Sequence, residues 1–265
     1  MEDKIHLDLE DFSSEPFFDA IIKEITEQDP SFLIGIIVAL AVVIITIVFL
    51  RFFLGTKKTR KAVLLVGLCD AGKTLLFSRL LTGRFIQTVT SITECKATYK
   101  AKKEKATSWT LVDIPGHDNL RAQFMEKFKD SARAIVFVVD SATFQKEVKD
   151  VAEFLYSVLT DSVLMKNAPT MLIACNKQDI TMAKSAKVIQ QQLEKELNTL
   201  RVTRSAALTS QDGSVQSTLY LGKKGKDFEF SQVSMQVEFV ECSARNSNKD
   251  ENGDIEALEK SLAKL

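Results

Sequence analysis

The most uniform pattern in the chain is an unbroken apolar stretch near its start. No charged residue occurs from Phe32 to Leu50, and the run reads SFLIGIIVALAVVIITIVFL from Ser31 onward. At about 1.5 Å of rise per residue, roughly 20 helical residues cover the ~30 Å hydrocarbon core of a bilayer. A buried core helix would show a polar face, and this run shows none. Residues 31–53 are therefore predicted to form a transmembrane helix.

Charge is distributed unevenly around this apolar run. Residues 1–30 contain ten Asp or Glu and only two Lys. The basic residues that follow the run, with no acid among them, are Arg51, Lys57, Lys58, Arg60 and Lys61. A cleaved signal peptide would instead have a short basic leader. Because Lys and Arg are retained on the cytosolic side, we predict a lumenal acidic segment 1–30, a basic juxtamembrane linker 54–61 and a cytosolic domain 62–265.

The overall composition excludes some classes of partner. The formal net charge of all 265 residues is zero, so no overall field would attract nucleic acid, and direct nucleic-acid binding is not expected. Four cysteines are scattered singly, without the spacing of metal ligands. They are expected to be the reduced thiols of a cytosolic domain.

Beyond the linker, short apolar runs alternate with amphipathic stretches. Strands are expected at 62–67, 95–101, 108–114, 134–140, 170–176 and 237–243. Several of these runs are almost entirely apolar, which is typical of central parallel strands covered on both faces. Apolar stripes at helical spacing lie between them, for example from Val148 to Leu159, and a closing helix is expected over 255–265. The alternation predicts a doubly wound α/β domain with a mostly parallel six-stranded sheet.

One stretch departs from this alternation. Residues 203–234 are rich in Ser, Thr, Gly and Lys. A long irregular segment inside a compact domain is either mobile or functional. Its end, FEFSQVSMQVEF, suggests an additional hairpin. We therefore expect an insertion loop over 203–234.

The strand at 62–67 leads into a loop that opens the next helix. Its sequence, Gly-Leu-Cys-Asp-Ala-Gly-Lys-Thr over 67–74, has the spacing and the strand-to-helix context of a phosphate-binding loop. The backbone amides of such a loop cradle phosphate oxygens. Lys73 would add a cation at the β- and γ-phosphates, and the Thr74 hydroxyl would bind Mg²⁺. The residues predicted to contact the nucleotide here are Gly67, Leu68, Cys69, Asp70, Ala71, Gly72, Lys73, Thr74 and Leu75.

The choice of base comes from a second motif, Asn-Lys-Gln-Asp over 176–179, at the carboxyl edge where α/β sheets bind ligands. A carboxylate at Asp179 would accept hydrogen bonds from N1–H and N2–H₂ of guanine, a donor pair that adenine lacks. Lys177 can lie on the base, and Asn176 can brace the phosphate loop. The turn after the last strand would add backbone contacts to the guanine oxygen. The residues predicted to contact the base are Asn176, Lys177, Asp179, Ser243 and Ala244.

A third motif, Asp-Ile-Pro-Gly over 113–116, ends another apolar strand. Asp113 would hold Mg²⁺ through water, and the Gly116 N–H would contact the γ-phosphate. A further Mg²⁺ ligand is expected within residues 85–93, where Ser91 is preferred and Thr90 or Thr93 would serve as well. The nucleotide contacts predicted in that segment are Thr88, Val89, Thr90 and Ser91.

Together these motifs resemble the small GTPase superfamily, closest to its Arf and Sar branch. The apolar run, GLCDAGKT and SARAIVFVVDSATFQKEVKDVAEFLY narrow the resemblance to the beta subunits of the signal recognition particle receptor of the endoplasmic reticulum. The resemblance implies a single-pass membrane protein whose GTP form holds the longin-like N-terminal domain of the receptor alpha subunit. Signal recognition particle, ribosome and translocation channel are then indirect partners.

Two questions stay open at this level. His117 stands where most small GTPases have the Gln that positions the attacking water. It is a candidate catalytic residue, but it is equally consistent with a slow enzyme whose bound GTP acts as a structural ligand. The alternative function is that of an Arf/Sar-like vesicle-trafficking GTPase, whose retractable amphipathic helix differs from a fixed span over 31–53.

Overall fold

The structure, a computed structural model, describes residues 30–53, 60–100, 108–211, 220–245 and 253–265. The chain divides into two units, Met1–Lys58 and Thr59–Leu265. The predicted acidic segment 1–30 and the predicted linker 54–61 lie almost wholly outside the described residues.

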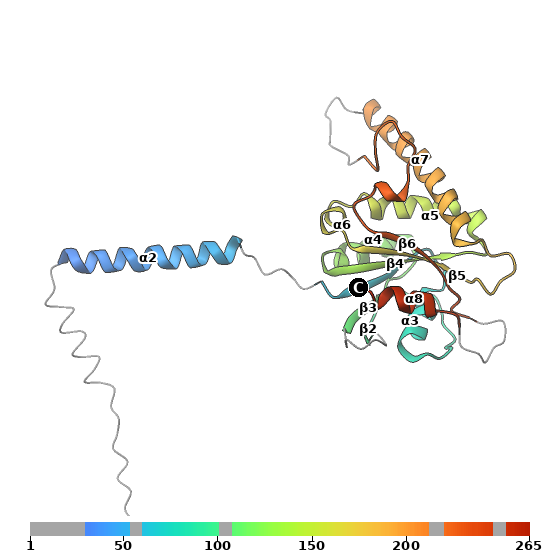
Figure 1. Cartoon of the computed structure of the whole chain (residues 1–265), viewed down its shortest axis with the longest axis horizontal. Coiled ribbons are helices and arrows are strands. Elements are labelled where there is room, and N and C mark those ends of the chain that lie inside the picture. Colours follow the sequence, from blue (N-terminus) through green and yellow to red (C-terminus); the bar gives the residue numbers. More distant parts are fainter. Residues whose placement is uncertain (1–29, 54–59, 101–107, 212–219, 246–252) are drawn as a thin grey trace, which may run out of the picture. The chain divides into compact units, whose positions relative to one another are not determined.

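In the first unit the apolar run forms helix α2 (Pro30–Phe53), drawn in blue in Figure 1. The Thr46 hydroxyl lies 2.7 Å from the Val42 carbonyl oxygen, so this polar group is satisfied within the helix itself. Ile37 and Ile45 are each 65% exposed. Among the helices of the described residues, none combines the length and the apolarity that crossing a membrane requires. The transmembrane helix over 31–53 therefore stays a prediction.

The second unit is built on one six-stranded sheet, which confirms the predicted sheet. Its strand order is β2-β3-β1-β4-β5-β6. Only the pair β2 and β3 is antiparallel; all other neighbours run parallel. The strands are β1 (Ala62–Val66), β2 (Cys95–Lys100), β3 (Ser108–Asp113), β4 (Ala132–Asp140), β5 (Thr170–Asn176) and β6 (Val237–Glu241).

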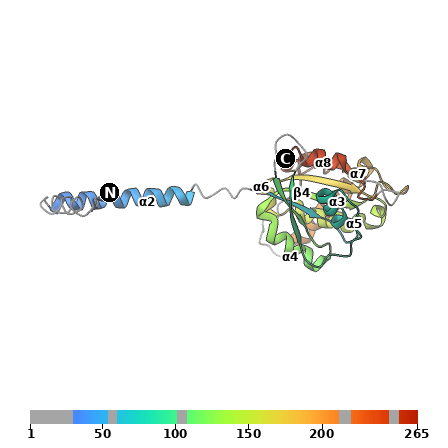
Figure 2. The same ribbon diagram turned by 90° about the horizontal axis from the view of Figure 1, so that it is seen from below.

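Helices cover both faces of this sheet, as Figures 1 and 2 show. The helices are α3 (Lys73–Thr82), α4 (Asp118–Phe128), α5 (Phe144–Leu159), α6 (Ser162–Asn167), α7 (Ala186–Gln211) and α8 (Glu256–Leu262), with 3₁₀ turns at Lys129–Ser131 and Phe230–Gln232. One core cluster joins the sheet to α5 and α7, and a second joins it to α3 and α8. The domain is therefore doubly wound, and the phosphate loop contacts both clusters, the first through Leu68 and the second through Ala71.

The central strand explains why the phosphate loop is held firmly. All five residues of β1 are buried. Leu64 and Val66 belong to the cluster under α5 and α7, whereas Val63 and Leu65 belong to the cluster under α3 and α8. Because side chains alternate between the faces of a strand, β1 is anchored on both sides. The phosphate loop therefore begins at the end of a strand whose position is fixed by packing on both faces of the sheet.

The predicted insertion loop over 203–234 is wrong in its first part. Helix α7 continues to Gln211, so residues 203–211 are helical. The physical reason is that no Gly or Pro interrupts the chain between Ala186 and Gln211, and such residues are what ends a helix. Among the described residues near its end, the expected hairpin is also absent; Phe230–Gln232 is a 3₁₀ turn, and four residues without helix or strand join it to β6.

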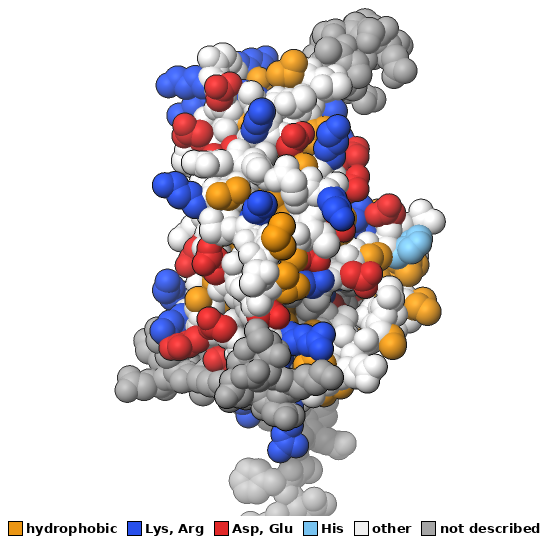
Figure 3. Space-filling view, turned by 90° about the vertical axis from the view of Figure 1, so that its right-hand side faces the viewer, with side chains coloured by type: hydrophobic (Ala, Val, Ile, Leu, Met, Phe, Trp, Pro, Cys, Tyr) orange, Lys and Arg blue, Asp and Glu red, His pale blue; other side chains and the backbone are white. Residues whose placement is uncertain are grey.

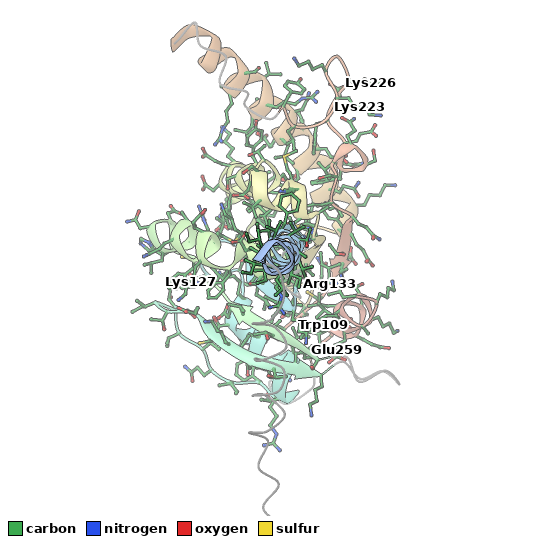
Figure 4. All side chains as sticks on the ribbon, turned by 90° about the vertical axis from the view of Figure 1, so that its left-hand side faces the viewer. Trp109, Lys127, Arg133, Lys223, Lys226 and Glu259 are labelled. Atoms are coloured by element: carbon green, nitrogen blue, oxygen red, sulfur yellow. The ribbon has the colours of Figure 1, made fainter. Side chains whose placement is uncertain are left out.

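The described end of this segment is organised around a buried cation. Arg201 is 4% exposed and donates from Nη1 to the carbonyl oxygens of Leu221 and Lys223, each at 3.4 Å. Its Nη2 donates to the carbonyl oxygen of Lys226. Lys223 and Lys226 lie on this segment beside α7 (Figure 4). Composition alone suggested an irregular loop, but one arginine satisfies several of its backbone carbonyls.

Candidate functional site

The phosphate loop joins β1 to α3, and its shape requires glycine. Gly72 caps α3 with φ 91° and ψ 20°, in the left-handed region. A Cβ atom at Gly72 would lie 2.4 Å from Nδ2 of Asn176, which is closer than two such atoms can approach. The glycine therefore lets the loop close against the strand end that carries the second motif.

Lys73 is the first residue of α3 and is only 6% exposed. Its Nζ donates to the carbonyl oxygen of Leu68 at 2.6 Å, across the loop. Burial lowers the pKa of Lys73, although the charge of Asp113 opposes this effect. A Cβ at Gly116 would lie 2.6 Å from this Nζ and 2.8 Å from the backbone nitrogen of Cys69. The third motif thus packs directly on the phosphate loop.

Two hydroxyls and a carboxylate converge beside Lys73. Thr74 Oγ1 donates to Oδ2 of Asp113 at 2.7 Å, and it lies 2.9 Å from Oγ of Ser91. The second oxygen of Asp113, Oδ1, is buried without a hydrogen-bond partner among the described residues. Burial raises the pKa of Asp113, and the Thr74 hydrogen bond and the Lys73 charge act against it. Hard oxygen atoms around an unsatisfied carboxylate suit Mg²⁺.

The same geometry separates the candidates in the segment 85–93. Ser91 is half-buried and lies within 3.5 Å of Asp113 Oδ2, whereas Thr90 and Thr93 are exposed. One pocket is lined by Cys69, Asp70, Gly72, Lys73, Thr74, Leu75, Thr88, Val89, Thr90, Ser91 and Gly116. His117 does not line this pocket. It is exposed and precedes α4, where its side chain makes no capping hydrogen bond.

The predicted base-contacting residues meet at the carboxyl ends of β5 and β6. Asn176 Nδ2 donates to the carbonyl oxygen of Ala71 at 2.8 Å, so the predicted brace to the phosphate loop is confirmed. The Ser243 hydroxyl donates to Oδ1 of Asp179. The Ala244 N–H donates to Asn176 Oδ1 at 3.0 Å. A contact from this N–H to a guanine oxygen would therefore have to share the donor with Asn176.

Two residues that sequence reasoning missed support these motifs. Asp140, the last residue of β4, pairs with Lys177 at 2.6 Å. Arg79, on α3, is 4% exposed and donates from Nε to the Ala244 carbonyl oxygen and from Nη1 to that of Gly83, each at 3.0 Å. Asp140 could have been suspected, because an acid ends an apolar strand at the edge that carries Asp113. Arg79 gives no such signal.

Comparisons with known proteins show which family this chain belongs to. The family described as signal recognition particle receptor beta subunit matches residues 58–237. The chain belongs to this family. The rat signal recognition particle receptor subunit beta is 58% identical over 252 residues, which are 95% of this chain and 93% of the rat protein.

Two solved structures of signal recognition particle receptors have a similar fold. A chain of the mammalian signal recognition particle receptor is 63% identical with a TM-score of 0.68, over 77% of this chain and 98% of that one. The signal recognition particle receptor SRb-GDP-Mg from Chaetomium thermophilum is 25% identical with a TM-score of 0.58, over 78% and 98%. Membership of the signal recognition particle receptor beta subunit family favours the receptor function over the vesicle-trafficking alternative.

Proposed function

We propose that this receptor beta subunit binds GTP or GDP with Mg²⁺, and that its GTP form holds the receptor alpha subunit at the endoplasmic reticulum. The observation that carries the proposal is the convergence of the phosphate loop, Gly116 and the Thr74–Asp113 pair around buried Lys73. A buried ammonium beside backbone amides fits a polyphosphate. The Chaetomium relative of similar fold is described with GDP and Mg, which supports the choice of ligand.

In this proposal Thr74 and Ser91 would supply hydroxyl ligands to Mg²⁺, and Asp113 would hold it through water. Bound Mg²⁺ would neutralise charge between the β- and γ-phosphates. Asp179 would accept the guanine N1–H and N2–H₂ on its two carboxylate oxygens, one of which, Oδ1, also accepts a hydrogen bond from the Ser243 hydroxyl. Gly116 would donate its N–H to the γ-phosphate. The site would then distinguish guanine from other bases and GTP from GDP.

The segment that lines the phosphate pocket is also the best candidate for partner contact. It exposes large apolar side chains: Val89 is 85% exposed, Ile92 is 74% and Ile86 is 48%. Hydrophobic side chains also gather beside the surface histidine in Figure 3. A partner seated there would be sensitive to the nucleotide, because Thr88 to Ser91 line the same pocket. We propose the longin-like N-terminal domain of the alpha subunit as that partner, with signal recognition particle, ribosome and translocation channel bound indirectly.

The membrane anchor is part of the same proposal. The uninterrupted apolar sequence of residues 31–50 is the observation that supports one span of the endoplasmic reticulum membrane. The basic residues after it support a lumenal N-terminus and a cytosolic GTPase domain. If the anchor is permanent, carbonate extraction should leave the protein in the membrane fraction. Release into the supernatant would contradict the span.

A nucleotide-dependent pull-down tests the function most directly. We expect tagged full-length protein, solubilised from membranes and loaded with GTP, to retain the alpha subunit, and GDP-loaded protein to retain much less. The charge-neutral pair Ile86→Ser and Ile92→Ser, at exposed positions that do not line the phosphate pocket, should weaken retention without changing GTP affinity. The matched control is Val202→Ser, which is 57% exposed on α7. Equal retention with both nucleotides would refute the switch.

Hydrolysis is expected to be slow without a partner. His117 is exposed and does not line the phosphate pocket. Its side chain is therefore not placed to orient the water that attacks GTP. Purified protein should therefore turn over GTP well below the ~1–10 s⁻¹ of ordinary enzymes. Single-turnover phosphate release measures this rate. His117→Ala should change it less than twofold, and a rate near 10 s⁻¹ would contradict the expectation.

A further inference from the structure

The lysine of the base motif has an unusual backbone conformation, and its side chain pairs with a buried acid. Lys177 has φ 67°, in the left-handed region that residues other than glycine rarely adopt. Its side chain is 30% exposed, and its Nζ lies 2.6 Å from Oδ2 of Asp140, whose side chain is 7% exposed. A long, flexible lysine would otherwise sample many rotamers. The pair therefore fixes where the lysine stem lies.

The two oxygens of Asp140 have separate tasks. Oδ1 accepts hydrogen bonds from the N–H groups of Ala142 at 2.9 Å and Thr143 at 3.3 Å, and so shapes the turn after β4. Oδ2 is left for Lys177. Burial tends to raise the pKa of Asp140, but the Lys177 hydrogen bond and charge, together with the backbone hydrogen bonds from Ala142 and Thr143, lower it. The carboxylate is therefore ionised at neutral pH and available as a fixed anion.

The turn after β4 is also tied to the backbone of the base motif. The Ser141 N–H donates to the Asn176 carbonyl oxygen at 3.0 Å, and Ser141 is fully buried. Gln178 Nε2 donates to the Ser141 hydroxyl at 3.0 Å and to the Lys184 carbonyl oxygen at 2.9 Å. Movement of this turn would therefore displace the whole base motif, so Asp140 sits at a rigid point.

We propose that Asp140 is the positioning residue that holds Lys177 along the face of the guanine base. This inference rests on the proposed function, since it assigns a role at the same nucleotide site. Asp140 does not touch the nucleotide in this role. It acts through Lys177, while Asp179 alone distinguishes the 2-amino group of guanine. In this arrangement the Asp140–Lys177 pair contributes affinity for any purine that lies against Lys177, and Asp179 contributes the selectivity for guanine.

Asp140→Asn tests the role because an amide can still accept the Ala142 and Thr143 hydrogen bonds while losing the charge that faces Lys177. With full-length protein, we expect binding of GTP, GDP and inosine triphosphate to weaken about tenfold each. Inosine lacks the 2-amino group, so the ratio of GTP to inosine triphosphate affinity should stay unchanged. Unchanged GTP affinity would overturn the inference, as would a collapse of that ratio, which indicates general distortion of the motif.

Asp161 offers a matched control with the same local architecture. Its Oδ1 accepts from the N–H groups of Val163 at 2.9 Å and Leu164 at 3.0 Å, and its Oδ2 pairs with Lys129 at 3.0 Å. Asp161→Asn should shift the melting temperature about as much as Asp140→Asn does, but leave nucleotide affinity unchanged. A loss of affinity in Asp161→Asn equal to that in Asp140→Asn would also overturn the inference.

A double-mutant cycle with Lys177→Met completes the test. If Asp140 acts through Lys177, adding Asp140→Asn to Lys177→Met should cause less than a twofold further loss of affinity. Additive losses would overturn the positioning role. Wild-type protein that fails to bind labelled GTP would refute the proposed function. Normal GTP binding by the wild type together with unchanged GTP affinity in Asp140→Asn would refute only this inference.

Discussion

Asp179→Asn should weaken GTP binding by about 10²-fold or more and create a preference for xanthosine triphosphate. The carboxylate of Asp179 is placed to accept two guanine donors, and an amide would turn one acceptor into a donor. Sites built around a substrate hydrogen bond reject ligands that leave it unpaired by up to ~10⁴–10⁵-fold. Xanthine carries an oxygen at position 2, which the new amide can donate to. The Ser243 hydroxyl can still donate to the remaining oxygen.

Competition of each nucleotide against labelled GTP measures this change. Asp150→Asn, an exposed acid on α5, is the control for the loss of one negative charge. Its GTP affinity should equal that of the wild type. Unchanged GTP affinity in Asp179→Asn would refute the base assignment, whichever partner the protein binds.

Lys73→Met is expected to have the second large effect. Each charge-assisted hydrogen bond to a phosphate contributes ~1.5–3 kcal/mol, so losing two of them lowers GTP affinity by about 10²-fold or more. Stability should respond in the opposite way. Because burial disfavours the Lys73 ammonium, an apolar side chain of similar shape should leave the melting temperature of nucleotide-free protein equal or higher.

Calorimetric titration with GTP and thermal melts without nucleotide separate these two effects. Lys166→Met, at an exposed position on α6, is the matched control and should change neither. GTP affinity within threefold of the wild type would show that Lys73 does not face phosphate. A large fall in the melting temperature would instead point to a structural role for the Lys73–Leu68 hydrogen bond.

How far the sequence could predict the site depended on the separation of the interacting residues. The phosphate loop could be predicted because its strand, turn and helix are consecutive in the chain. The partners of Asp140 and Arg79 could not, because Lys177 lies 37 residues away and Ala244 lies 165 residues away. Only the folded sheet brings such pairs together, and local composition does not show which residue is the partner of which.

Two other differences have similarly specific causes. Ser91, Thr90 and Thr93 are chemically alike, so only their exposure and distance to Asp113 distinguish them. The composition of residues 203–234, rich in Ser, Thr, Gly and Lys, predicts a loop, yet α7 continues to Gln211 because no Gly or Pro interrupts residues 186–211.

Arg79 gives the site a property that neither motif has alone. One buried guanidinium donates both to Ala244, in the turn beneath the base motif, and to Gly83, which ends α3 just before the segment that reaches Ser91. Displacing either carbonyl group would disturb the Arg79 guanidinium, which also donates a hydrogen bond to the other carbonyl oxygen. A substitution that removes the Arg79 guanidinium should therefore disturb both the base-binding turn and the end of the helix that precedes the segment reaching Ser91.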